Sequence, residues 1–151
     1  MESELKLLKV SINNVLELTD DLTTQQLNEI PTGSPNNLVW HLAHLLVTHK
    51  LLIYGLSNNE LNLEPEFVER FRKGSKPNGD VSAEEINVIK SKIKNLSAEL
   101  ENDLKNNHFK AYQQYPTSYN FEITNLTDAV AFNNLHFGLH VSSMLKLKKL
   151  V

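Results

Sequence analysis

The sequence contains no cysteine among its 151 residues. The chain can therefore form neither a disulfide nor a thiolate metal ligand, and it has no cysteine nucleophile. Any thiol chemistry at this protein would need a thiol supplied from outside. These absences leave histidine, carboxylate and hydroxyl side chains as the groups from which a chemical site would be built.

Excess positive charge is also missing. Lys and Arg total 15 against 18 Asp and Glu, so the formal net charge is -3 and the pI is near 6.1. This balance provides no basic field for nucleic acid, and we expect no nucleic-acid partner. A small cluster near the end, Lys146, Lys148 and Lys149, is expected to complement a helix C-terminus, where cations meet unpaired carbonyl groups.

The N-terminal segment lacks an uninterrupted hydrophobic region. Residues 1–6 mix acidic residues and lysine with apolar ones, so we expect no signal peptide and a cytoplasmic protein. The most apolar stretch, residues 38–56, is long enough to consider as a membrane span, but it contains three histidines and Lys50. These residues favour a buried helix over a membrane span, and we expect no membrane partner.

No internal repeat, low-complexity segment or second domain is evident, so we expect a single domain over residues 1–151. A chain of this length buries roughly 68–70% of its unfolded surface without disulfides or a structural metal. A bound metal would therefore be expected to serve function rather than to hold the fold together.

Apolar residues recur at three- and four-residue intervals, which predicts an all-α chain. A capping-box pattern, Ser82 followed by Glu85, begins the clearest helix. Residues 106–125 are predicted to be a long loop with some extended structure at 121–123, and loops of that length are often functional. Helical segments are expected at residues 5 to about 19, 22–27, 36 or 37 to about 55, 65–72, 82 to about 104 and 127–149. Four long helices with one long crossover connection predict a four-helix bundle.

Five of the six histidines lie in two short apolar segments, residues 41–49 and 136–140. His136 and His140 are one helical turn apart, so both imidazoles point to the same side of a helix, as in helical zinc sites. His44 is expected to face inward from the second long helix. Buried imidazoles need partners, and a metal would satisfy several at once. The alternative is a set of core histidines bonded to serine, asparagine or tyrosine.

The other three histidines are assigned different roles. His41 is one turn before His44, so it could bind a metal directly, orient another ligand or face a subunit interface. His49 follows His44 by five residues, about 500° around the helix, and is predicted to lie on the surface or at a rim. His108 is expected to cap a helix end or to be solvated.

The chain resembles the DinB-like superfamily of four-helix-bundle proteins over nearly its whole length. The motifs that carry this resemblance are Asn37-Leu38-Val39-Trp40-His41-Leu42-Ala43-His44, Tyr54-Gly55-Leu56-Ser57, Phe71-Arg72-Lys73-Gly74-Ser75-Lys76-Pro77 and Phe132-Asn133-Asn134-Leu135-His136-Phe137-Gly138-Leu139-His140. The resemblance implies a three-histidine metal site made by His44, His136 and His140, with water completing the coordination. The metal would be a divalent transition metal such as zinc, nickel or iron.

Two positions depart from the pattern of the family. Ala43 stands where glycine often precedes the second-helix histidine, and Phe137 stands where glutamate often follows the first histidine of the last helix. A phenyl group can neither transfer a proton nor orient an imidazole. If that glutamate contributes to the chemistry of relatives, the same chemistry is in question here, although a metal site could persist without it.

Three functions remain open. The resemblance implies a metal-dependent enzyme, with a thiol S-transferase-like activity that uses a low-molecular-weight thiol and a small electrophilic substrate. A metal-bound water could instead support hydrolysis. The third possibility is a non-enzymatic homodimer with a vestigial or absent metal site. We expect a homodimer, which is also compatible with an enzyme, because the second helix is apolar on more than one side and should leave surplus apolar surface for self-association. The residues on which that expectation rests are Leu38, Leu42, Leu45, Leu46, Leu52 and Ile53.

Overall fold

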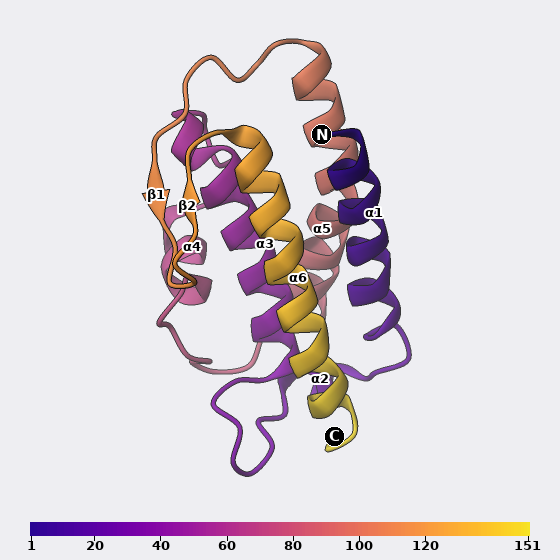
Figure 1. Cartoon of the computed structure of the whole chain (residues 1–151). Coiled ribbons are helices and arrows are strands. Elements are labelled where there is room, and N and C mark those ends of the chain that lie inside the picture. Colours follow the sequence, from indigo (N-terminus) through magenta and orange to yellow (C-terminus); the bar gives the residue numbers. More distant parts are fainter.

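The structure, a computed structural model of residues 1–151, contains four long helices that form a bundle. They are α1 (Glu2–Glu17), α3 (Leu38–Ile53), α5 (Ala83–Lys105) and α6 (Leu126–Lys148). Helix α3 packs against α5 and α6, and α1 packs against the same two helices. The four helices therefore occupy the corners of the bundle (Figure 1), and the predicted all-α four-helix bundle is confirmed.

The predicted long crossover lies between α3 and α5. These two helices run in the same direction, opposite to α1 and α6 (Figure 1), so residues 54–82 must return along the length of the bundle. This connection contains a 3-10 turn, η1 (Gly55–Ser57), and a short helix, α4 (Pro65–Phe71). Another short helix, α2 (Thr24–Asn28), lies between α1 and α3 in the chain and packs on α3.

Side-chain caps mark where α3 and α5 begin. The side chain of Asn37 accepts a hydrogen bond from the backbone N–H of Trp40 at 2.9 Å and begins α3. Ser82 accepts from the N–H of Glu85 at 3.2 Å and begins α5. The reciprocal half of the predicted capping box is not made, because the Glu85 carboxylate instead accepts a hydrogen bond from Arg70 at 2.7 Å. Each cap satisfies one of the unpaired N–H groups of a first helical turn.

Helix α3 is almost completely buried, with only Thr48 and Leu51 partly exposed. The six apolar residues that were expected to leave surplus surface are all buried, at 6% exposure or less: Leu38, Leu42, Leu45, Leu46, Leu52 and Ile53. The expectation was wrong because α2, α4 and η1 cover α3 in addition to α5 and α6. A helix that is apolar all round is the kind that a bundle buries completely. The argument for self-association from this helix therefore has no basis.

Residues 106–125 connect α5 to α6 through a small hairpin. Strand β1 (Tyr115–Pro116) pairs antiparallel with β2 (Glu122–Ile123), with Tyr115 opposite Ile123. This confirms the extended structure expected near residues 121–123. The segment is held to the end of α3 by a 2.7 Å hydrogen bond from the Tyr112 hydroxyl to the Leu52 carbonyl. The hairpin lies beside α3 and α6 (Figure 1). None of the helices is both long and apolar enough to cross a membrane.

Candidate metal centre

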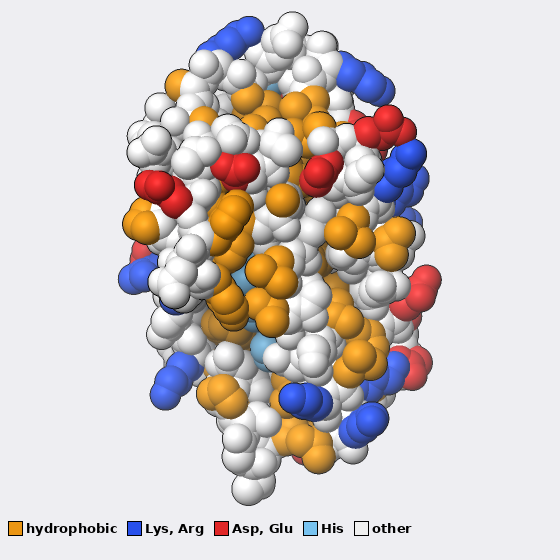
Figure 2. Space-filling model, in the orientation of Figure 1, with side chains coloured by type: hydrophobic (Ala, Val, Ile, Leu, Met, Phe, Trp, Pro, Cys, Tyr) orange, Lys and Arg blue, Asp and Glu red, His pale blue; other side chains and the backbone are white.

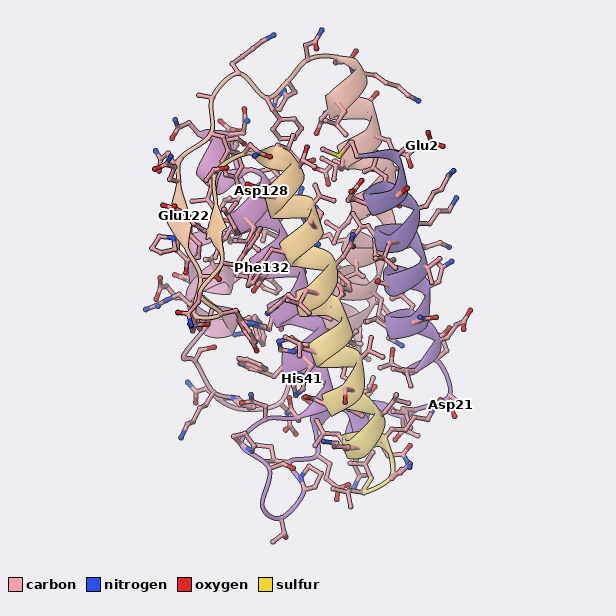
Figure 3. The ribbon with its side chains drawn as sticks, viewed as in Figure 1. Glu2, Asp21, His41, Glu122, Asp128 and Phe132 are labelled. Carbon is pink, nitrogen blue, oxygen red and sulfur yellow. The ribbon has the colours of Figure 1, made fainter.

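Four histidines meet where α3 and α6 face each other. His41 and His44 extend from α3, and His136 and His140 extend from α6, so each helix supplies two imidazoles one turn apart. Figure 3 marks the position of His41 beside α6. One nitrogen from each of His44, His136 and His140 lies within 4.8 Å of the other two. The structure thus brings together the three residues that were predicted as ligands, and their binding of a metal stays a prediction.

His44 is held from two sides. Its Nδ1 lies 2.7 Å from the carbonyl oxygen of Phe71, at the end of α4, to which it donates as a neutral imidazole. Trp40 stacks on its ring with centroids 4.5 Å apart and planes 9° apart. The indole N–H of Trp40 donates to Ser75 Oγ at 3.1 Å. These contacts leave the Nε2 lone pair of His44 directed towards α6.

Gly74 allows the chain after α4 to reach the indole. Its φ is +89°, in the region that residues with a side chain rarely adopt. The turn places Ser75 against Trp40, and Lys73 and Gly74 beside the same group of histidines. The motif around residues 71–77 therefore has a direct structural role, because its backbone carbonyl and its serine fix the orientation of His44.

His136 makes the contact that is most informative about a metal. Its Nε2 is 3.3 Å from His44 Nε2. Two nitrogens that each lie about 2.0–2.1 Å from one tetrahedral zinc ion are themselves about 3.3 Å apart. His136 Nδ1 is buried and has no hydrogen-bond partner. The hydroxyl of Thr48 also lies 3.3 Å from His44 Nε2, where it can donate a hydrogen bond.

The imidazoles of the cluster are kept neutral. Burial, with a smaller contribution from the neighbouring imidazoles of His44 and His41, lowers the pKa of His136 to about 3. Burial likewise lowers the pKa of His41 to about 4 and the pKa values of His44 and His140 below their ordinary value. Neutral imidazole is the form that binds a metal ion. The protonation state of the cluster and the 3.3 Å separation of His44 Nε2 and His136 Nε2 therefore suit a divalent transition metal.

The cluster forms one wall of a cleft of about 670 Å³. Most of the remaining lining is aromatic or aliphatic, and it includes Phe132 of α6 and two tyrosines of the hairpin segment, Tyr115 and Tyr119. No aspartate or glutamate lines the cleft, and Lys73 is its one lysine or arginine. Figure 2 shows histidine surface between hydrophobic side chains on the face formed by α6 and the hairpin. The opening gives a small molecule access to the imidazoles.

The prediction for His49 was wrong. This residue is fully buried between α3 and α6, where its Nδ1 lies 3.3 Å from the side-chain nitrogen of Asn133. The angular argument correctly placed it away from His44, but the side of α3 on which His49 lies is covered by the rest of the bundle. His108 is exposed just after the end of α5, as expected.

The two departures from the family pattern lie away from the cleft lining. Phe137 is fully buried and belongs to the hydrophobic core, although its neighbour His136 lines the cleft. Successive helical residues differ by about 100° in direction, which explains the separation. Ala43 is also fully buried. Phe137 therefore acts here as a packing residue.

Sequence reasoning missed the groups that support the histidines. The Phe71 carbonyl and the Ser75 hydroxyl come from a connection far along the chain from α3. A backbone carbonyl leaves no trace in residue identity, and a single serine carries little signal. The contact between His41 and His140 also could not be assigned, because the sequence left three roles for His41 open.

The family model of the DinB superfamily matches residues 7–144. This range includes all of α3 and α5, most of α6 and each histidine of the cluster. A search of curated proteins found no sequence that matches the chain.

Proposed function

The chain belongs to the DinB superfamily, and from this premise we propose that it is a metal-dependent enzyme whose divalent ion is held by His44, His136 and His140. The observation that carries the proposal is the approach of three imidazole nitrogens within 4.8 Å of one another at the wall of a cleft. Three histidines that leave a coordination position open are a known catalytic arrangement for zinc.

Zinc, nickel and iron(II) are the candidate ions. A donor set of imidazoles suits all three, and the cluster contains no thiolate or carboxylate that would select among them. We therefore propose a divalent transition metal without choosing among the three. Analysis of the metal that the protein retains after purification identifies which one it is.

A thiol S-transferase-like reaction fits the cleft better than hydrolysis. The bound ion would supply Lewis acidity, which lowers the pKa of a thiol or of water. The chain offers no cysteine, so the thiol would be a low-molecular-weight cosubstrate. Hydrolysis commonly also uses a positioned general base. The cleft contains no carboxylate for that purpose, and the Nδ1 of its additional imidazole, His41, is already paired with His140.

The cleft walls define what the second substrate should resemble. Aromatic and aliphatic side chains such as Trp40, Leu56 and Phe132 would bind the apolar body of a small electrophile. Ser118 and Tyr119 belong to the hairpin segment and offer hydroxyl groups at the same cleft. The chain's own contribution is thus to bind both substrates beside the imidazoles and to exclude bulk water from one side of them.

Turnover assays separate the alternatives. Metal-loaded protein is incubated with a panel of low-molecular-weight thiols plus an aryl halide or epoxide, and in parallel with a panel of esters and amides. Thiol-dependent product formation that His136→Ala abolishes supports the proposal. Ester or amide hydrolysis without thiol favours the hydrolase, and inactivity of the metal-loaded protein in both assays favours a non-enzymatic protein. Light scattering then tests whether such a protein is a homodimer.

A further inference from the structure

The contact between His41 and His140 differs from the contact between His44 and His136. Nδ1 of His41 lies 2.7 Å from Nδ1 of His140, whereas Nε2 of His44 lies 3.3 Å from Nε2 of His136. Two nitrogens bound to one ion at about 2.0–2.1 Å are separated by about 2.9 Å at right angles and by more in a tetrahedron. The shorter contact is therefore a hydrogen bond between two rings, and the longer one fits a shared ion.

Only one of the two Nδ1 atoms in this hydrogen bond can carry the hydrogen. If His41 donates, His140 Nδ1 accepts, and a neutral His140 must then carry its hydrogen on Nε2, where it blocks metal binding. If His140 donates, its Nε2 lone pair is free. Binding of an ion through His140 Nε2 is therefore compatible with one arrangement, in which His41 Nδ1 accepts and His41 Nε2 carries a hydrogen.

We propose that His41 is a positioning residue of the metal centre, which accepts the Nδ1 hydrogen of His140 and thereby fixes the Nε2 lone pair of His140 towards the ion. This inference rests on the proposed three-histidine site. His41 plays for His140 the role that the Phe71 carbonyl plays for His44. Metal-binding histidines commonly donate their other ring N–H to such a partner, which sets the tautomer and the ring orientation.

The surroundings of His41 suit this role. It is 8% exposed, and its ring packs edge-on against Trp40 with centroids 5.5 Å apart. The same indole stacks on His44. Trp40 thus contacts the ring of one ligand and the ring that orients another, so the position of His41 is fixed before any ion binds. His136 has no comparable partner, because its Nδ1 is buried without a hydrogen bond.

The test measures zinc affinity by competition with a chromophoric chelator. His41→Phe keeps a ring of similar size but removes the acceptor, and it should weaken zinc binding by roughly 10- to 100-fold, the usual effect of losing such a partner. His41→Gln restores an acceptor oxygen and should recover much of the affinity. His108→Phe is the matched control, since His108 is exposed and outside the cleft, and it should bind zinc like the wild type.

Two results would overturn the inference while leaving the proposed metal site intact. Wild-type affinity in His41→Phe would show that His41 positions nothing, and complete loss in both His41 variants, as in His140→Ala, would make His41 a ligand. A wild-type protein that binds no zinc, nickel or iron(II) would instead remove the proposed function itself.

Long-range nitrogen NMR of the zinc-loaded wild type provides a measurement that does not depend on the folding of a variant. It should show the His140 hydrogen on Nδ1 and the His41 hydrogen on Nε2. A hydrogen on His41 Nδ1 would overturn the inference.

Discussion

Histidines on α3 occupy two contrasting environments only five residues apart. His44 faces a cleft, where imidazoles from α6 approach its free nitrogen, whereas His49 is sealed in the core against Asn133 of the same α6. At His44 the Nε2 lies within 3.3 Å of both Thr48 and His136 at the cleft, whereas at His49 the Nε2 is buried without any partner. The comparison shows that access from a cleft, and not residue type or the choice of helix, separates a candidate site from a packed polar pair.

Removal of a proposed ligand should produce the largest effect and should separate the two environments. His44→Ala and His140→Ala should each reduce metal affinity by more than the roughly 100-fold that loss of an orienting partner costs, because a direct bond to the ion is lost. His49→Ala should leave metal affinity close to that of the wild type. Calorimetric zinc titration measures the three affinities, and helical circular dichroism verifies that each variant folds. Full occupancy in either ligand variant would contradict the assignment.

His49→Ala should change the free energy of unfolding, although it leaves metal affinity close to that of the wild type. His49→Ala creates a cavity and leaves the Asn133 amide without its partner, so it should destabilise the metal-free protein by about 2–4 kcal/mol. Replacing both residues by leucine removes the buried polar atoms and should recover most of that loss. Urea unfolding of the two variants provides the measurement. A double variant that is no more stable than His49→Ala would show that the polar pair is needed for the fold.

A second buried polar pair on α3 should show a smaller effect. Lys50 pairs with Glu99 of α5, and their side chains are 5% and 33% exposed, respectively. Glu99→Ala leaves the buried ammonium without its partner and should cost about 1–3 kcal/mol in urea unfolding. Lys50→Met should cost less, because the half-exposed Glu99 can be hydrated. The exposed pair of Lys6 and Glu2 is the control, and Lys6→Ala should change stability by about 0.5 kcal/mol or less. An equal loss of stability in Glu99→Ala and Lys6→Ala would contradict the expectation that the buried pair matters more than the exposed one.

Much of this contrast was accessible from the sequence, but not all of it. The 3.6-residue period placed His136 and His140 on one side of a helix and directed His44 inward, because these relations depend only on positions along one helix. The same period could not place His49, since a position away from the cleft is exposed only if nothing packs there. A stretch with a single charged residue, Lys50, in 16 positions is the signal that nearly all of α3 is buried.

The cap at Ser82 was likewise predictable, and the cap of α3 was predictable to within Asn36 or Asn37, because a cap is a local contact between a side chain and the next turn of backbone. The supporting contacts of the histidines were not predictable. They join α3 to residues 71–75 and to α6, and a sequence carries no measure of which distant segments meet.

Acidification should lower the free energy of unfolding gradually. Burial and the neighbouring Lys50 charge lower the pKa of His49 from 6.5 to about 3. Above pH 6.5 the folded and unfolded states are both neutral at this residue, so its contribution to stability is fully present. Between pH 6.5 and 3 only the unfolded state takes up the proton, so the free energy of unfolding falls by up to about 1.4 kcal/mol per pH unit. The contribution is lost as the pH falls through about 3.

Urea unfolding of the metal-free protein between about pH 7 and 5 measures this dependence. The variant with leucine at positions 49 and 133 should show a shallower pH dependence than the wild type, because it lacks His49. Both proteins retain the cleft histidines, so the difference between their slopes reports on His49. Identical slopes in the wild type and the double variant would contradict a neutral buried His49.

The metal content of the chain tests the three-histidine centre most directly. Protein purified without chelators and incubated with zinc, nickel or iron(II) is analysed by elemental mass spectrometry, beside His140→Ala treated in the same way. The proposed site predicts about one transition-metal ion per wild-type chain and none in the variant. A wild-type protein that stays metal-free after all three incubations, or a variant that retains the full ion content, would contradict it.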